Sequence, residues 1–345
     1  MMCIVRWVFL GIALAFIICC RYMPALAEGY AQTVYPVLSC GLSAFSSLLP
    51  FPLMEVFVVG LILVLILYPI RLRKKRFRLR QIIFREGEIL AWVYVWFYLG
   101  WGLNYYRYNI YTRLQTPPAA YEEQYFQDFL KEYTDRLNAA YQPTISMDDE
   151  ELKQYVHAFY ANLPSTYGLA KPHLWQEPKN FIFTSIYSKV GVLGSMGPFF
   201  AEAQLNADLP DVQYPFTYAH EFSHLMGVSN EAEANYWAYR VCTESPSPTL
   251  QYCGYFGLLP YVISNASFLL QEAAFKEWIQ TIRPEVIEQY KQKNAYWQER
   301  YSPLIGSVQD FAYNLFLKGN KIPSGKKNYA EVIGLLLSLP HNDKG

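Results

Sequence analysis

The central segment of the chain reads Pro215-Phe-Thr-Tyr-Ala-His220-Glu221-Phe-Ser-His224-Leu-Met-Gly-Val-Ser-Asn-Glu231-Ala-Glu-Ala-Asn235. It contains His220-Glu221-x-x-His224, in which side chains that can bind a metal are grouped at ligand spacing. Residues four apart on a helix lie on one face, so the two imidazoles can point at one ion. A carboxylate beside that ion can accept a proton from a metal-bound water. We therefore predict a metal-binding helix with Glu221 as the catalytic base.

A catalytic zinc site needs a third protein ligand and an open fourth position. Gly227 is placed to end the metal helix in a left-handed conformation and turn the chain back. A second helix is expected to follow, with Asn230 as its N-cap and Glu233 completing a capping box. This arrangement leaves Glu231 as the predicted third ligand, and Glu233 remains the alternative.

The metal helix is apolar around its motif, because Glu221 is the only charged residue between positions 217 and 226. This pattern resembles the long form of the zincin metallopeptidase signature. The second helix resembles the Glu-x-x-Ala-Asp pattern of the Glu-zincins, with Asn235 in place of the Asp. The resemblance implies the following roles: Zn²⁺ as cofactor, His220, His224 and Glu231 as its ligands, Glu221 as the base, and Asn235 as a hydrogen-bond partner of a metal-binding histidine.

The composition favours a membrane protein. The chain has 345 residues, of which 52% are hydrophobic and 17% are charged, with no net charge. A soluble domain usually has about a quarter of its residues charged, so part of the apolar content is expected in a membrane. There is no basic excess to predict a nucleic-acid partner. The expected partners are the lipid bilayer and a peptide or protein substrate.

Three hydrophobic segments lie near the N-terminus, at about 4–22, 48–70 and 89–106. The first is either a membrane span or a cleaved signal peptide. Residues 71–80 contain seven Lys and Arg side chains, whereas residues 21–54 contain one Arg and no Lys. The positive-inside rule therefore predicts that the basic loop is cytoplasmic and that the chain after residue 107 is extracytoplasmic. The predicted location is the bacterial inner membrane, with several passes.

The expected organisation has three parts. Residues 1–107 form the membrane region, 108–120 a linker, and 121–345 an extracytoplasmic domain with a helical C-terminal part from 249. The predicted fold class is thus an α-helical membrane anchor joined to a mainly α (α+β) zincin-like domain, with a small β-sheet and an active-site helix.

Within the domain, two segments are predicted to be strands, 181–186 and 199–205, and the region 195–206 occupies the place of the substrate-binding edge strand of zincins. The role of Glu202 in that region stays open. The predicted helices cover 121–140, 147–163, 249–272, 273–297, 307–317 and 329–339.

Several other polar residues have weaker interpretations. His157 and His173 are expected to be structural, and a Cys242–Cys253 disulfide is the simplest pairing outside the cytoplasm. Four tyrosines could donate a hydrogen bond to a developing oxyanion, although packing is the expected role of each: Tyr236, Tyr239, Tyr252 and Tyr255.

The order of these parts resembles a family of uncharacterised bacterial membrane proteins. The resemblance includes Trp101-Gly-Leu-Asn-Tyr-Tyr-Arg107, Gly197-Pro-Phe-Phe-Ala-Glu-Ala-Gln-Leu-Asn206 and the His-Glu-x-x-His segment with Glu-x-Glu-Ala-Asn235. It implies no substrate. Two hypotheses follow: a membrane-anchored zinc metallopeptidase, or a non-catalytic membrane-anchored binding or scaffold protein that retains a zincin fold.

Overall fold

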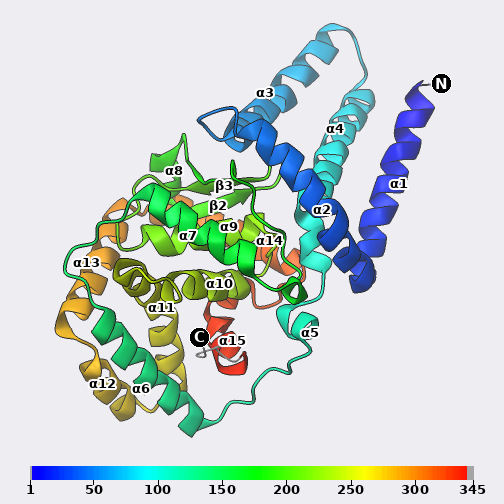
Figure 1. Ribbon diagram of the computed structural model, residues 1–345. Helices are drawn as coiled ribbons and strands as arrows, with labels where there is room; N and C mark the ends of the chain where they lie inside the picture. Colours follow the sequence, from blue (N-terminus) through cyan, green and yellow to red (C-terminus); the bar gives the residue numbers. More distant parts are fainter. Residues whose placement is uncertain (1, 340–345) are drawn as a thin grey trace.

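The computed structural model describes residues 2–339 and is mainly helical (Figure 1). Within that range one three-stranded sheet is present. The predicted combination of mainly α structure with a small sheet is confirmed at this level. The N-terminal helices project to one side of a larger helical body that contains the sheet.

Two helices of the described chain are long and apolar enough to cross a membrane. They are α1 (Met2–Tyr22), over Val5–Tyr22, and α3 (Leu53–Lys74). Few of their residues are buried, 17% in Val5–Tyr22 and 6% in Leu53–Lys74, and the others are exposed or half-buried. Both helices agree with the first two predicted hydrophobic segments.

The other N-terminal helices differ from the prediction. Residues in the expected loop 21–54 form α2 (Pro24–Ser46), which begins with a proline at its first turn, where the missing N–H costs nothing. The segment 89–106 is divided between α4 (Leu79–Gly100) and a 3₁₀ helix, η1 (Gly102–Tyr106). Because α4 starts within the charged region, it is not among the helices apolar enough to span.

The rest of the chain forms the helical body. Its core consists of α9, α10 and α11 packed together, with Phe222, Trp237 and Phe256 fully buried. The helices are α5 (Ile110–Leu114), α6 (Glu123–Ala140), α7 (Asp149–Asn162), η2 (Ser165–Tyr167), α8 (Thr184–Lys189), α9 (Tyr214–Leu225), α10 (Glu231–Thr243), α11 (Pro248–Leu269), α12 (Glu272–Thr281), α13 (Pro284–Arg300), α14 (Pro303–Gly319), η3 (Gly325–Glu331) and α15 (Val332–Ser338).

The sheet differs from the two predicted strands. It has the order β1-β3-β2, with β1 (Lys179–Asn180) parallel and β2 (Gly194–Gly197) antiparallel to β3 (Glu202–Leu205). The prediction of a strand at 181–186 is wrong, because residues 182 and 183 form a turn and residues 184–186 belong to α8. The strand predicted at 199–205 is shorter, and β2 forms the edge of the sheet.

Predicted helix boundaries at the C-terminal end are partly right. The segment 273–297 is two helices, α12 and α13, because Pro284 begins a new helix there. Helix α14 is longer than the predicted 307–317, and the segment 329–339 is shared between η3 and α15.

Carboxylates bind the start of α3 to the helical body. The buried carboxylate of Glu202 accepts hydrogen bonds from the backbone N–H groups of Leu53 and Met54, both at 3.0 Å, and pairs with Lys179. In return, Glu55 of α3 accepts from the backbone N–H groups of residues 182 and 183, at the start of α8. Glu202 therefore caps a helix, which answers the question that the sequence left open.

Candidate metal centre

A glycine bend joins the two helices of the site. Helix α9 ends at Leu225, and Gly227 has φ 95°, the left-handed conformation that only glycine adopts without strain. Asn230 caps α10, because its side chain accepts from the backbone N–H of Glu233 at 3.0 Å. The bend brings the first residue of α10, Glu231, back over the last turn of α9.

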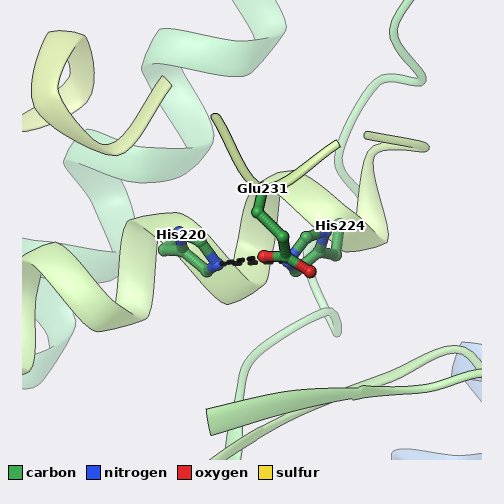
Figure 2. Close-up of side chains that lie close together, drawn as sticks. All are labelled: His220, His224 and Glu231. Carbon is green, nitrogen blue, oxygen red and sulfur yellow. Dashed lines mark hydrogen bonds and ion pairs between the residues drawn. The ribbon is translucent and has the colours of Figure 1, made fainter. Parts of the chain in front are cut away.

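Three of the predicted residues meet in one buried cluster (Figure 2). Glu231 Oε2 lies 3.2 Å from His220 Nε2 and 3.4 Å from His224 Nε2. The two Nε2 atoms are 3.2 Å apart. All three side chains are nearly inaccessible to solvent, and Figure 2 shows the carboxylate directed at both imidazoles.

Hydrogen bonds to the other ring nitrogens fix the histidine tautomers. Nδ1 of His220 lies 2.8 Å from Asn235 Oδ1, and Nδ1 of His224 lies 2.8 Å from the Val228 carbonyl oxygen. The Asn235 amide cannot be reversed without loss, because its Nδ2 donates to the Tyr329 carbonyl at 3.1 Å. Both Nδ1 atoms therefore carry a proton, and neutral rings present lone pairs at both Nε2 atoms.

The cluster thus directs three lone-pair donors at one point, an arrangement that requires a cation or a proton between them. Ligand atoms about 2.0–2.1 Å from a tetrahedral metal ion are separated by about 3.3 Å. The observed separations are 3.2, 3.4 and 3.2 Å. The residues present therefore fit a metal ion in both chemistry and spacing.

Electrostatics in the metal-free cluster indicate the same need for positive charge. Burial opposes protonation of His224, but the Glu231 carboxylate outweighs burial and raises the pKa of His224 to about 9. Burial would raise the pKa of Glu231, yet the two imidazoles hold that pKa well below its usual range. At neutral pH the metal-free cluster consequently holds a proton where a cation would lie.

Glu221 lies next to the cluster and does not belong to it. Burial raises the pKa of its carboxyl group, with partial compensation from the two histidines. Within the described chain no hydrogen-bond partner reaches Glu221 Oε2. The side chain lies against β2, where a Cβ on Gly194 would come 2.5 Å from Glu221 Cγ. Only glycine therefore leaves room for this carboxylate.

The cluster and Glu221 line a cavity of about 670 Å³ between the end of α4, the edge strand β2, and the pair α14 and η3. Its polar groups include the cluster, Glu221 and the pair of Asp310 and Lys326. Much of the remaining wall is aromatic or aliphatic or belongs to β2: Phe97, Trp101, Gly194, Ser195, Met196, Tyr313, Phe316 and Tyr329.

Two tyrosines of this cavity are absent from the prediction. Tyr313 donates from its hydroxyl to Glu231 Oε1 at 2.7 Å. The ring of Tyr329 stacks on His220 at 6.0 Å between centroids, and its hydroxyl lies 3.3 Å from that of Tyr313. Both lie far along the chain from the motif, and no local pattern marks them.

The four tyrosines proposed from sequence as oxyanion donors do not line the cavity. All four are buried in the helical core: Tyr236, Tyr239, Tyr252 and Tyr255. Their packing role is the one expected from sequence, so the hydroxyl groups near the cluster are those of other tyrosines.

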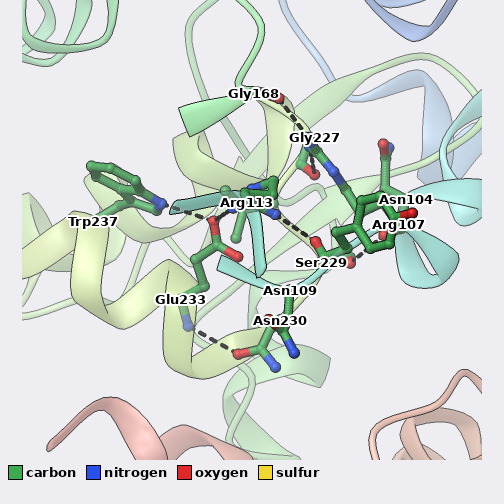
Figure 3. A network of polar contacts seen from close by, with 12 residues as sticks. Asn104, Arg107, Asn109, Arg113, Gly168, Gly227, Ser229, Asn230, Glu233 and Trp237 are labelled. Carbon is green, nitrogen blue, oxygen red and sulfur yellow. Dashed lines mark hydrogen bonds and ion pairs between the residues drawn. The ribbon is translucent and has the colours of Figure 1, made fainter. Parts of the chain in front are cut away.

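The alternative ligand, Glu233, is not part of the cluster, and Figure 3 shows its side chain beside Arg113 and Trp237. Its carboxylate pairs with the buried Arg113 and accepts from Trp237 Nε1 at 3.1 Å. The predicted capping box is therefore only half formed. The side chain of Asn230 caps the helix, but the Glu233 carboxylate does not bond back to the Asn230 backbone.

The glycine bend is held from outside by Arg107 (Figure 3). Its guanidinium donates to the carbonyl oxygens of Gly227 at 3.3 Å and Gly168 at 2.6 Å, and it pairs with the buried Glu28 of α2. On the other side, Trp101 Nε1 donates to the His224 carbonyl at 3.0 Å. The N-terminal region thus contributes directly to the site through Trp101 and Arg107.

The other histidines and the cysteines considered from the sequence lie outside the cluster. His157 Nε2 lies 2.7 Å from the Gln176 carbonyl, and His173 stacks on Trp175. Cys242 and Cys253 are buried free thiols, so the disulfide predicted between them is not formed.

Comparison with known proteins gives one match. A family model described as "Protein of unknown function (DUF3810)" matches residues 30–337, which is most of the chain. No curated protein and no solved structure matches it.

Proposed function

The chain belongs to the DUF3810 family, and we propose that it is a membrane-anchored zinc-dependent metallopeptidase with a zincin-like active site. It would hydrolyse peptide or protein substrates outside the cytoplasm. The single observation that carries the proposal is the convergence of three lone-pair donors beside an unpartnered buried carboxylate in one cavity.

The donor set supports zinc. One group of catalytic zinc sites uses two histidines and one glutamate as ligands and keeps a fourth position open. His220, His224 and Glu231 supply the same set of side chains. Bound zinc supplies Lewis-acid chemistry and lowers the pKa of a bound water to about 7.

The protein residues then have distinct roles. Glu221 holds an unpaired carboxylate oxygen in the cavity, where it accepts the proton of the attacking water and returns it to the leaving amine. Asn235 keeps the proton of His220 on Nδ1 and so leaves Nε2 free. Tyr313 and Tyr329 place hydroxyl groups beside the carboxylate of Glu231, and Tyr313 orients it.

The edge strand supports a peptide as substrate. β2 has one neighbour in the sheet, β3, and its residues Gly194 to Met196 line the cavity next to Glu221. An extended peptide can add to such an edge through main-chain hydrogen bonds, which places its backbone beside the carboxylate. The apolar walls of the cavity would accept its side chains.

The topology follows from the charges. The basic segment 71–80 lies at the end of α3, and by the positive-inside rule it would be cytoplasmic. The N-terminal halves of α1 and α4 lie together, since Arg6 pairs with Glu88. The opposite ends of α1 and α4, together with the start of α3, would then face the outside of a bacterial inner membrane and carry the helical body.

The decisive experiment uses the full chain in lipid nanodiscs. We expect about one zinc per chain, by elemental mass spectrometry, and cleavage within a diverse peptide library. Glu221→Gln should keep the zinc and lose the cleavage. Glu132→Gln, on an exposed ion pair of α6, is the matched control and should change neither.

The peptidase proposal would be refuted if the protein is purified without metal and if Glu221→Gln leaves peptide cleavage unchanged. That result would support the other hypothesis, a non-catalytic membrane-anchored scaffold that retains the fold.

A further inference from the structure

Helix α14 has its apolar side turned outward. The exposed side chains Leu304, Val308, Phe311 and Leu315 follow the spacing i, i+4, i+7, i+11, so they form one stripe along the helix. Their exposed fractions are 81%, 66%, 67% and 54%. We call these four residues the apolar stripe. A surface helix of a soluble body normally presents the opposite pattern.

The inner side of the same helix forms a wall of the cavity. Tyr313 and Phe316 line the cavity, and Tyr313 bonds to Glu231 of the cluster. The acidic residue of the helix, Asp310, is only partly exposed and pairs with Lys326. The charge on the exposed side is that of Lys318, in the last turn. A single helix therefore separates the cavity from the apolar stripe.

The C-terminal end of α14 is attached to α1 and α4, and its start is attached to α8, which contacts α3. At its C-terminal end, the Gly319 carbonyl accepts from Arg21 of α1 at 3.0 Å, and Asn320 accepts from Tyr98 of α4 at 2.7 Å. At its start, the N–H of Ser302 donates to the Lys189 carbonyl at the end of α8 at 2.8 Å. Helix α8 in turn is capped by Glu55 of α3.

The segment at the start of α8 is apolar on its exposed side as well. Ile182, Phe183 and Ile186 are 47%, 40% and 56% exposed. This segment adjoins the start of α3, and the C-terminal end of α14 adjoins the C-terminal ends of α1 and α4. The exposed apolar surfaces of the candidate spans, α1 and α3, begin at these ends. This continuity selects one occupant for the stripe, the lipid that would surround those spans.

We propose that α14 lies on the outer surface of the membrane, with its apolar stripe in the lipid interface, and that the cavity behind it receives peptide segments close to the bilayer. The orientation rests on the proposed function, in which the helical body is extracytoplasmic. The stripe is about 16 Å long at a rise of 1.5 Å per residue, which is typical of a short interfacial helix. Since a helix is about 10 Å across, the cavity would lie about 10 Å from lipid.

The proposal narrows the substrate class. A soluble protein would have to approach the cavity along the membrane surface. A peptide attached to the same bilayer by a lipid or a transmembrane segment is already held at the distance from the bilayer at which the cavity lies. The expected substrates are therefore the membrane-proximal segments of anchored proteins.

Photo-crosslinking of the full chain in phosphatidylglycerol–phosphatidylethanolamine nanodiscs tests the placement of α14. Phe311→benzoylphenylalanine and, separately, Leu315→benzoylphenylalanine should give about tenfold more lipid adduct than the control, as a side chain inserted in the interface requires. The matched control is Phe268→benzoylphenylalanine, an 86% exposed phenylalanine at the end of α11. All three side chains are exposed, so none of the changes removes core packing.

The outcomes separate this proposal from the proposed function. Adducts at both α14 positions support the interfacial helix, and they should persist in the Glu221→Gln background, in which peptidase activity is absent. Adducts no more frequent than at Phe268 would overturn the placement, whatever the peptidase result. Crosslinks from Phe311 to a second copy of the chain, in place of lipid, would also overturn it and assign the stripe to a dimer interface.

Discussion

Replacing Asn235 by leucine should weaken zinc binding without unfolding the protein. Leucine has nearly the shape of asparagine but cannot accept from His220 Nδ1, which lies 2.8 Å from the amide oxygen. In the metal-free variant the His220 proton can move to Nε2, toward the Glu231 carboxylate 3.2 Å away. With metal bound that tautomer is excluded, because Nε2 must present its lone pair. The cost therefore falls mainly on the metal-bound state.

The size of the effect follows from the burial of the site. A buried donor left without its acceptor costs about 1–3 kcal/mol, and 1.4 kcal/mol corresponds to a factor of ten in affinity. Losses of 10–100-fold are typical when a partner of a metal-binding histidine is removed. We expect the Kd for zinc to rise by about 30-fold in Asn235→Leu.

The assay is competition with a chromophoric zinc chelator, with the full chain in nanodiscs. Asn265→Leu is the matched control, because Asn265 also donates from an amide to an η3 carbonyl, that of Ala330, but touches no ligand. The control separates the loss of the Asn235 bond to Tyr329 from the loss of its bond to His220. Equal zinc affinities in Asn235→Leu and Asn265→Leu would refute the reasoning.

Four further predictions concern the cluster and its neighbours. Glu231→Gln should remove zinc, whereas Glu233→Gln should keep it and lower the free energy of unfolding by about 3 kcal/mol, because Arg113 loses its buried partner; zinc loss from the Glu233 variant alone would reverse the ligand assignment. Zinc affinity should rise about tenfold per pH unit from 6.5 to 9 and then level off, because below the raised pKa of His224 (about 9) binding displaces a proton. Since that pKa is raised in the fold, the metal-free protein should lose stability over the same interval as the pH rises, and melting curves independent of pH would contradict this. Tyr313→Phe should raise the Kd for zinc about tenfold by removing a hydrogen bond to a charged ligand, and an unchanged Kd would show that the hydroxyl does not hold Glu231.

The meeting of His220, His224 and Glu231 in one cluster could be predicted because their placement is local. Four-residue spacing puts His220 and His224 on one face, and a glycine that tolerates positive φ turns the chain within a few residues. The capping preference of Asn230 then sets the register of the second helix and selects Glu231 as the residue over the bend. Each step depends only on residues within a few positions of one another along the chain.

The errors arise where a distant group decides local structure. Residues 181–186 have the β-branched and aromatic composition of a strand, but Glu55 accepts from the backbone of residues 182 and 183 and starts a helix there. β2 has two glycines and little strand propensity, and it forms where Glu221 needs the space that a side chain at 194 would fill. Glu233 would complete a capping box if the buried Arg113 did not bind it first.

Position 235 is Asn where the Glu-zincin pattern has Asp, and the contact of this side chain with η3 explains why an amide fits better than a carboxylate. The side chain must accept from His220 Nδ1 on one side and donate to the Tyr329 carbonyl on the other, at 3.1 Å. A carboxylate can do only the first, and it would set an oxygen against the carbonyl oxygen in a buried site. An amide satisfies both neighbours, and it ties the orientation of the His220 ring to the segment that also places Tyr329 on that ring. The substitution is therefore consistent with a working site, in which η3 and α14 take over part of the support that a charged partner would give.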